Sequence, residues 1–319
     1  MNVLVTGSSG FLGTALCTYL EAQGCDLVRL TSKNCDLRDP HSLDRFDDRE
    51  YSLIFHLAAW TQAGDFCLHH PGDQWIINQQ INTNTLAWWA RSQPQAKMVI
   101  MGTSCAYAPG SDLRETEYMA GEPIDSLYTY AMTKRMLYQG VRALNRQYGL
   151  SYLCAVPSTL YGPGYHADGR QMHFIFDLIR KIIRGREFRE PVVLWGDGWQ
   201  RREVVLVDDF ARLLWNLVCE QDNDIFNIGA GEEHSIRTFA SKICTIVGYS
   251  EDEIVYDEQR YIGATSKCLN VEKARQALPR YTLHSLDDGL RATIDWFYRT
   301  QAYLTPEERR VLDDVRASS

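Results

Sequence analysis

The sequence predicts an α/β protein built on a doubly wound parallel sheet, with a smaller α/β subdomain towards the C-terminus. Short apolar strands alternate with helical stretches across the first half of the chain, a pattern typical of a parallel sheet with helices on both faces. After Pro163 this regular alternation gives way to polar loops between shorter elements. We therefore expect a sheet domain first and a second, less regular subdomain packed on it.

Composition and charge exclude several classes of partner. With 319 residues, of which 45% are apolar and 23% charged, the chain can bury a substantial core. Its formal charge of −8 argues against a nucleic-acid-binding or acidic-membrane surface, and no apolar run is long enough to span a bilayer. No signal peptide is apparent. The nine cysteines are scattered without Cys-x-x-Cys spacing, so we expect reduced thiols in a cytoplasmic protein and no metal site.

A glycine-rich segment follows the first strand, which we expect over residues 2–6. It reads G-x-x-G-x-x-G and runs into a helical pattern closed by Gly24, which is the setting of a dinucleotide-binding loop. Glycines let backbone approach a pyrophosphate, and the helix N-terminus offers free N–H groups and a positive dipole end. The motif predicts a Rossmann-type domain rather than a plain glycine turn. Its candidate cofactor-binding residues are Gly7, Ser9, Gly10, Phe11, Leu12 and Gly13.

The end of the second strand (residues 26–30) indicates which dinucleotide binds. A cofactor without a 2′-phosphate usually has its ribose hydroxyls bound by an Asp or Glu at this point. The chain has Ser32 and Lys33 instead, which supply a hydroxyl and a positive charge and so favour NADP(H). Asp36 and Leu37 follow on a turn and are candidates for the adenine edge, although Asp36 equally suits a helix cap.

A third strand (residues 51–57) runs into Leu57, Ala58 and Ala59, where small residues let the backbone pass close to the cofactor. His56 in this strand is expected to be packed rather than catalytic. The other elements predicted in the first half are a helix over 75–91 and strands over 97–101 and 151–156.

The fourth strand leads to Thr103, and a helix beyond it carries Tyr130 and Lys134. Residues four apart lie on one face of a helix, so the phenol and the ammonium would point into one site. We expect the ammonium to stabilise the phenolate and to lower the pKa of Tyr130. Together the three groups can bind a carbonyl oxygen and protonate it while a hydride reaches the carbon. Tyr-x-x-x-Lys also occurs by chance, so this interpretation depends on the surrounding motifs.

The second half divides less regularly. We expect a helix over 172–184, a strand and tight turn over 192–198, a strand from 201 followed by a capped helix to 219, and a strand over 224–228. The predicted domains are an NADP-binding Rossmann domain over 1–162, which residues 202–230 rejoin, and a substrate-binding subdomain formed by 163–201 and 231–319.

In order along the chain, these motifs resemble the extended short-chain dehydrogenases/reductases, which mostly remodel sugars carried on nucleoside diphosphates. The similarity covers nearly the whole chain, and further matching segments are residues 160–163, Arg202-Glu203, 207–209 and 226–229. The resemblance implies catalytic roles for Thr103, Tyr130 and Lys134. It also implies cofactor contacts by Tyr130, Lys134, Pro157, Leu160 and His173.

Within that family, residues 103–107 are most similar to enzymes that epimerise C3 and C5 of a GDP-4-keto-6-deoxy-hexose and reduce C4 with NADPH. There, Cys105 and His173 would be the acid/base pair of the epimerisation. A 4-keto group acidifies the protons at C3 and C5, so a thiolate and an imidazolium can exchange them. Without the resemblance, Cys105 would read as an inert thiol and His173 as a core histidine. The implied substrate-binding residues are Ser104, Lys181, Trp195, Arg202 and Lys267, although Lys181 also suits a solvated position.

Two alternatives stay open. A related enzyme would reduce or epimerise another nucleoside-diphosphate sugar without the double epimerisation. A non-enzymatic binding module would keep the fold without catalysis, which the intact Thr103, Tyr130 and Lys134 argue against. In either enzymatic case we expect a nucleotide-sugar substrate and a homodimer, whose four-helix seam would use the apolar helices at 86–90 and 136–144.

Overall fold

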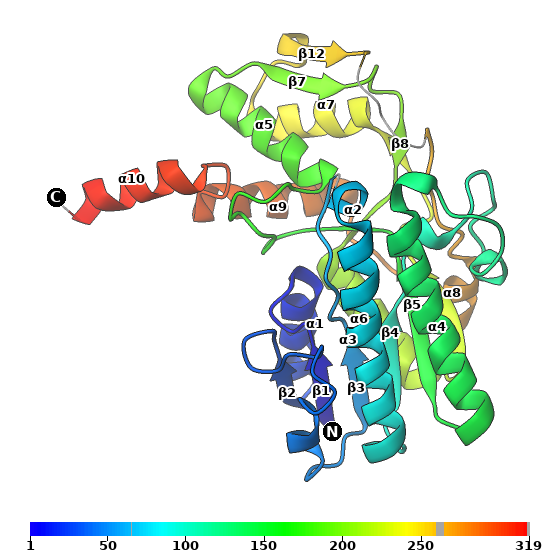
Figure 1. Ribbon diagram of the computed structural model, residues 1–319. Coiled ribbons are helices and arrows are strands. Elements are labelled where there is room, and N and C mark those ends of the chain that lie inside the picture. The colour runs from blue at the N-terminus through cyan, green and yellow to red at the C-terminus, as the bar shows by residue number, and fades with distance from the viewer. Residues whose placement is uncertain (65, 260–264, 318–319) are drawn as a thin grey trace.

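The computed structural model describes residues 1–64, 66–259 and 265–317 (Figure 1). Its centre is a sheet of parallel strands: β1 (Asn2–Thr6), β2 (Asp26–Leu30), β3 (Leu53–His56), β4 (Lys97–Met101), β5 (Tyr152–Pro157) and β10 (Asp224–Ile228). The strand order is β10–β5–β4–β3–β1–β2. The chain passes from β1 outward to β2 and then to β3 on the other side of β1, so the order reverses there. Ligands of open α/β sheets bind outside the carboxyl ends of the strands at such a point.

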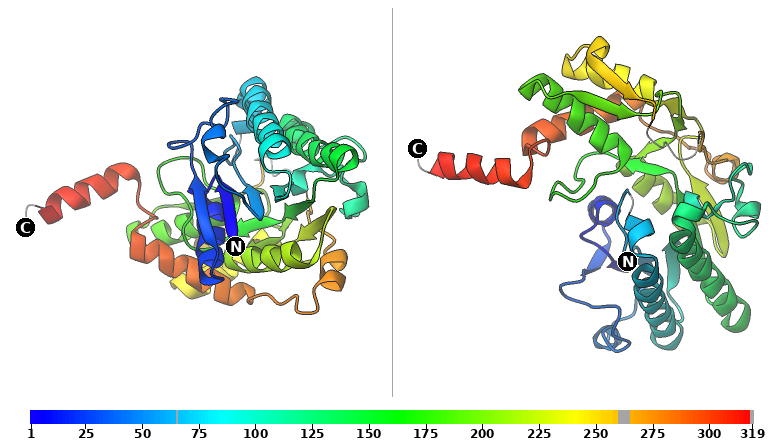
Figure 2. Two further views of the ribbon diagram at one scale, coloured as in Figure 1. Left: turned by 90° about the horizontal axis from the view of Figure 1, so that it is seen from below. Right: turned by 45° about the horizontal axis from the view of Figure 1, so that its top comes forward.

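Helices cover both faces of this sheet: α1 (Phe11–Ala22) and α6 (Val207–Glu220) lie on one, α3 (Pro71–Ser92) and α4 (Tyr128–Tyr148) on the other (Figure 2). Successive residues of a strand face opposite sides. Val3 and Val5 accordingly share a buried cluster with α1 and α6, whereas Leu4 belongs to the cluster beneath α3 and α4. The predicted doubly wound parallel sheet is confirmed.

A second layered unit lies beyond the carboxyl ends of the strands (Figure 1). Its helices α5 (Phe174–Phe188), α7 (Ile236–Val247) and α9 (Leu286–Thr300) pack around one apolar cluster with the parallel pair β7 (Val192–Trp195) and β12 (Ile254–Asp257). Two further pairs are β6 (Thr159–Tyr161) with β9 (Val204–Leu206) and β8 (Arg201–Arg202) with β11 (His234–Ser235). The other helices are α2 (Phe66–His69), α8 (Glu272–Ala277) and α10 (Pro306–Ala317), which extends away from the body.

The structure corrects two expectations about the segment from Arg201. One strand was expected there, but Glu203 separates β8 from β9 and turns its buried carboxylate to the N–H groups of Gly231 and Leu269, each at 2.8 Å. The helix that follows begins at Val207 with no side-chain cap. The break between the two strands arises from contacts with distant parts of the chain.

The expected dimer seam also needs correction. Leu86, Trp88 and Trp89 are buried in the chain's own core, so these three side chains are not available to a partner. Met136, by contrast, is 41% exposed on α4.

Within the described ranges, no helix is both long and apolar enough to cross a membrane. All nine cysteines are unpaired. β10, from the segment expected to rejoin the Rossmann domain, lies at the edge of the sheet beside β5. The division into 1–162 with 202–230, and 163–201 with 231–319, stays a prediction.

Candidate active site

The glycine-rich loop after β1 is shaped by close backbone contacts. Gly7 has a φ of 64°, and a side chain there would lie 2.8 Å from the Ala58 nitrogen. A side chain on Gly13 would lie 2.2 Å from the Gly7 carbonyl oxygen. The Thr6 hydroxyl accepts the N–H groups of Leu57 and Ala58, each at 3.1 Å. The loops after β1 and β3 therefore meet where the strand order reverses.

The N-terminus of α1 is open to a ligand. Its N-cap, Gly10, has no side chain to bind the first-turn N–H groups, and the first turn carries no acidic residue. Those N–H groups and the helix dipole present positive charge beside exposed Ser9, which fits the pyrophosphate of a dinucleotide. Phe11, at the start of α1, packs edge-on against Tyr165 and Phe176 of the second unit, at centroid distances of 5.2 and 5.6 Å. Leu12 is half-buried beside it.

Ser32 and Lys33 lie exposed on the turn after β2. Arg29, earlier in the strand, is already paired with Glu21. This leaves Ser32 and Lys33 as the residues best placed to meet a 2′-phosphate, the hydroxyl as a hydrogen-bond partner and the ammonium as a positive charge.

Asp36 does not cap a helix. Its carboxylate accepts the backbone N–H of Arg38 at 3.1 Å and binds the same residue's guanidinium at 2.6 and 2.8 Å, which lowers the pKa of Asp36. The side chain of Leu37 is buried in the core, and its carbonyl accepts the Asn84 side-chain amide at 2.9 Å.

Three further cofactor candidates, Ala59, Pro157 and Leu160, are half-buried beyond β3, at the end of β5 and in β6. His56 is packed, as predicted. Its ring nitrogens bond Thr6 at 3.0 Å and Asn82 at 3.1 Å, and burial lowers its pKa to about 4.

Thr103 and Tyr130 are hydrogen-bonded to each other, and buried Lys134 lies one turn further along α4. The expectation that the ammonium lowers the pKa of Tyr130 is wrong for this structure. Burial raises that pKa and Cys105 adds to the shift, while the Thr103 hydrogen bond opposes it. Burial also lowers the pKa of Lys134 to about 8. Compared with water, the protein surroundings thus shift both the Tyr130 phenol and the Lys134 amine towards their uncharged forms.

Cys105 differs from the other cysteines. Burial raises the pKa of all the others. Burial acts on Cys105 too, but the Lys267 ammonium, whose Nζ lies 3.1 Å from the Cys105 Sγ, and the Thr103 hydroxyl outweigh it, and the pKa of Cys105 is lowered. A thiol with such neighbours is a candidate base or nucleophile.

His173 is the N-cap of α5, and its Nδ1 accepts the Phe174 N–H at 3.1 Å. The residue is exposed to solvent, although enough protein lies around its ring for desolvation to act on it. This burial, with the positive charges of Lys267 and Arg202, lowers the pKa of His173 to about 4. Its imidazole is therefore neutral near pH 7 before a substrate binds.

Two pockets border these residues and share Arg202. The larger, of about 660 Å³, is lined by His173, Lys181, Trp195 and Arg202 among others. The smaller, of about 240 Å³, is lined by Ser104, Cys105, Lys267 and Arg202 among others. The two pockets thus contain all five substrate-binding candidates. Lys181 is not simply solvated, because it pairs with Asp177 at 2.9 Å and donates to the Val193 carbonyl at 3.2 Å.

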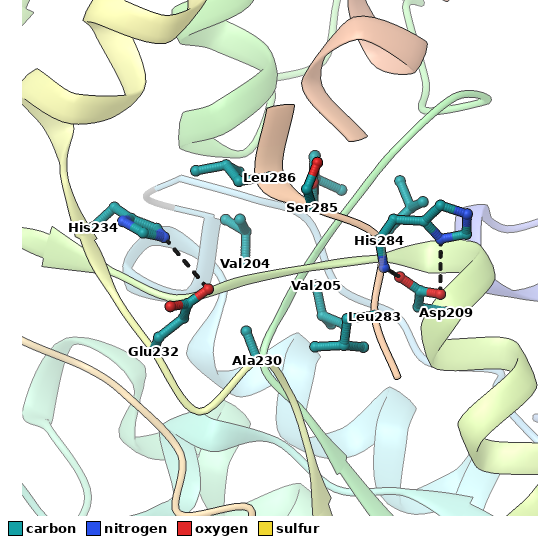
Figure 3. Close-up of a pocket in the computed structure, with 12 residues that line it drawn as sticks. Val204, Val205, Asp209, Ala230, Glu232, His234, Leu283, His284, Ser285 and Leu286 are labelled. Carbon is teal, nitrogen blue, oxygen red and sulfur yellow. Dashed lines mark hydrogen bonds and ion pairs between the residues drawn. The ribbon is translucent and has the colours of Figure 1, made fainter. Parts of the chain in front are cut away.

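A third pocket, of about 230 Å³, contains none of the predicted site residues (Figure 3). Asp209 accepts the backbone N–H and the ring nitrogen of His284 there, at 2.8 and 3.0 Å, and Glu232 pairs with His234 at 3.8 Å. Among the described residues no cluster of His, Cys, Asp or Glu could hold a metal. We assign no chemistry to this pocket.

Sequence reasoning missed the groups that hold the catalytic residues in place. The buried phenol of Tyr118 accepts the Thr103 N–H at 3.2 Å, and a side chain on Gly102 would lie 2.8 Å from the phenol oxygen. Glu233 accepts the Lys267 N–H at 3.1 Å. Neither Tyr118 nor Glu233 belongs to a recognisable motif, and no local spacing links them to their partners.

A central parallel sheet, a glycine-rich loop and a Thr, Tyr, Lys cluster are found together in dinucleotide-dependent enzymes. Residues 3–229 match the NAD dependent epimerase/dehydratase family, and the chain belongs to that family. The predicted resemblance to extended short-chain dehydrogenases/reductases is thereby confirmed.

Within this family, the chain is similar to several enzymes of known name. The chain is 29% identical to the GDP-L-fucose synthase of Escherichia coli (strain K12), over 94% of this chain and 97% of that protein. It is 26% identical to the GDP-L-colitose synthase of Yersinia pseudotuberculosis, over 85% and 89%. A crystal structure of a GDP-L-fucose synthetase from Naegleria fowleri bound to NADP has the same fold, with a TM-score of 0.84, 22% identity and coverage of 94% and 93%.

Proposed function

We propose that this protein is an NADPH-dependent nucleotide-sugar 3,5-epimerase/4-reductase that acts on a GDP-4-keto-6-deoxy-hexose, like its GDP-L-fucose synthase relatives. One observation carries the proposal: Cys105, with its lowered pKa and its contact to Lys267, lies two residues from Thr103 and close enough to Tyr130 to influence its titration. A base for proton exchange and an acid for carbonyl reduction thus share one site.

The residues present fit NADP(H). The backbone amides at the start of α1 would bind the pyrophosphate, and Ser32 and Lys33 would bind the 2′-phosphate. Lys134 would lie beside the ribose and the nicotinamide. When bound, the cofactor supplies the hydride. The chain contributes positioning and a proton: Tyr130 gives its proton to the 4-keto oxygen while Thr103 keeps the phenol oriented through their hydrogen bond.

Epimerisation would use Cys105 and His173. The Cys105 thiolate takes a proton from the carbon beside the 4-keto group, and the C–H electron pair moves into an enolate on the keto oxygen. His173 returns a proton from the other side. Lys267 and Arg202 lower the pKa of His173, and a substrate diphosphate bound near them would offset their charge and raise that pKa.

A simpler function is a 4-keto reductase of a nucleoside-diphosphate sugar without the double epimerisation. The neutral state of His173 before substrate binds favours this second candidate, since a neutral imidazole is a poor proton donor.

Hydrogen exchange at carbon tests the proposal. Incubation with a 4-keto-6-deoxy-hexose carried on GDP, in deuterated water, should place deuterium at C3 and C5 as read by NMR. Cys105→Ser and His173→Asn should each reduce incorporation at one or both carbons. NADPH binding, followed by fluorescence, should be preserved in Cys105→Ser. If the wild type places deuterium at neither carbon yet oxidises NADPH, the simple reductase is the correct assignment.

We further propose that the protein works in the cytoplasm as a homodimer. Its unpaired cysteines suit a reducing compartment, and exposed apolar side chains on α3 and α4 suit a self-associating surface.

A further inference from the structure

Two carboxylates from distant parts of the chain fix the segment that carries Lys267. Residues 266–269 belong to no helix or strand. The Glu233 carboxylate accepts the Ser266 hydroxyl at 2.8 and 2.9 Å and the backbone N–H of Lys267 at 3.1 Å. Glu203 accepts the N–H of Leu269 at 2.8 Å. The backbone is thus held on both sides of the lysine.

Both carboxylates are themselves constrained. Glu203 is 3% exposed, and its other oxygen accepts the Gly231 N–H at 2.8 Å. The side chain of Glu233 is 16% exposed and pairs with Arg201 at 2.8 Å. These contacts connect residues 266–269 to the strands β8 and β9 and to the loop before β11.

We propose that Glu233 and Glu203 are positioning residues for Cys105, because they hold residues 266–269 where the Lys267 ammonium contacts the sulfur at 3.1 Å. A lysine on a mobile backbone would lose conformational entropy on making this contact. A backbone that is already fixed reduces that entropic cost. The inference extends the proposed function, in which the thiolate is the base. When Cys105 takes a proton from carbon it becomes a thiol, and the Lys267 ammonium keeps its own protons.

The other titratable groups near Cys105 do not supply this charge. Burial raises the pKa of Tyr130 on α4 and of Cys67 on α2, so both are neutral near pH 7. His173 is neutral for the reason given above. Arg202 lines the same pocket as Cys105, but within the described part of the chain Lys267 is the cation in hydrogen-bonding distance of the sulfur.

The protonation of Cys105 can be measured without a substrate, so the test does not depend on the proposed function. The ultraviolet absorbance of thiolate is titrated against pH in the full chain and in Cys105→Ser, and the difference reports Cys105. Alkylation by iodoacetamide, with peptide mass spectrometry, assigns the reacting thiol. Lys267→Met should raise the Cys105 pKa by about one unit or more, and Lys267→Arg should restore much of the shift.

Glu233→Gln tests the positioning step. An amide binds the Ser266 hydroxyl and the Lys267 N–H less strongly than a carboxylate, so the pKa of Cys105 should rise by part of the Lys267→Met shift. Glu232→Gln is the matched control, because Glu232 neighbours Glu233 but its side chain is 69% exposed. This substitution should leave the pKa of Cys105 unchanged. Thermal unfolding checks that each variant is folded.

An unchanged Cys105 pKa in Lys267→Met overturns the proposal. If Glu233→Gln instead behaves like Glu232→Gln, the positioning role is overturned. The Cys105 pKa could shift as expected in these variants although the wild-type protein exchanges no sugar protons. That result would contradict the proposed function and leave this inference standing.

Discussion

The side chain of Tyr130 keeps its proton because protein surrounds it, and the Thr103 hydrogen bond offsets this effect only in part. A phenol that stays protonated has a proton to give. Lys134, with its pKa lowered to about 8 by burial, is largely charged at neutral pH and lies one helical turn away.

Replacing Tyr130 by Phe therefore removes the acid and leaves the packing almost intact. Turnover of the reductase should fall by roughly 10²–10⁴-fold, the range of general acid catalysis, with NADPH affinity nearly unchanged. Steady-state NADPH oxidation and a fluorescence titration measure the two quantities. Tyr128→Phe, on the same helix but 39% exposed, is the matched control and should retain activity. Comparable turnover in both variants would exclude Tyr130 as the acid.

The grouping of Tyr130 with Lys134 was predictable because helical spacing is local. The protonation states were not, because they depend on burial, which the spacing of residues does not report. The Lys267–Cys105 contact joins residues far apart in the chain and follows no periodicity, so tertiary packing alone creates it.

At the level of helices and strands, local patterns were again predictable and long-range contacts were not. The strands of the main sheet were predicted to within a few residues, because all except the edge strand β2 are largely apolar runs buried on both faces. The break between β8 and β9 could not be foreseen, since the partners that hold Glu203 come from other segments. The start of α5 at Phe174, two residues later than expected, places His173 at its N-cap beside the pocket.

The turn after β2 gives a prediction about the cofactor. Lys33→Glu replaces a positive charge with a carboxylate, which should repel a 2′-phosphate and accept hydrogen bonds from ribose hydroxyls instead. NADPH affinity should fall by about tenfold or more, and preference should move towards NADH. Fluorescence titration of both nucleotides with one protein preparation provides its own control. Wild-type protein that binds NADH as tightly as NADPH would contradict the assignment.

Across the whole molecule, the sheet domain and the second unit approach each other at two places. Phe11 packs on Tyr165 and Phe176, and a side chain on Gly64 would overlap the Gln171 side chain at 1.9 Å. Gly64 and Gln171 both line the larger pocket. The two units therefore form its walls together, which explains why the candidate site residues come from both halves of the chain.

The outer surface of α3 and α4 is where we expect a second copy of the chain. Trp75, Ile76, Tyr128 and Met136 are 39–57% exposed there. An apolar groove of about 420 Å³ runs between the N-terminal turns of the two helices. Such a surface is costly to leave in water and would be covered in a dimer.

Ile76→Glu should therefore convert a homodimer into monomers, because a carboxylate buried at an apolar interface without a partner is strongly unfavourable. Sedimentation velocity over a range of protein concentrations reports the change. Val255→Glu is the matched control: Val255 on β12 is 56% exposed, against 57% for Ile76, but lies on the second unit, so its substitution should leave the dimer intact. If both variants dissociate, the effect is general destabilisation rather than loss of this interface. If the wild-type protein sediments as a monomer at every concentration, the proposed homodimer is wrong. The exposed apolar side chains of α3 and α4 would then need another explanation.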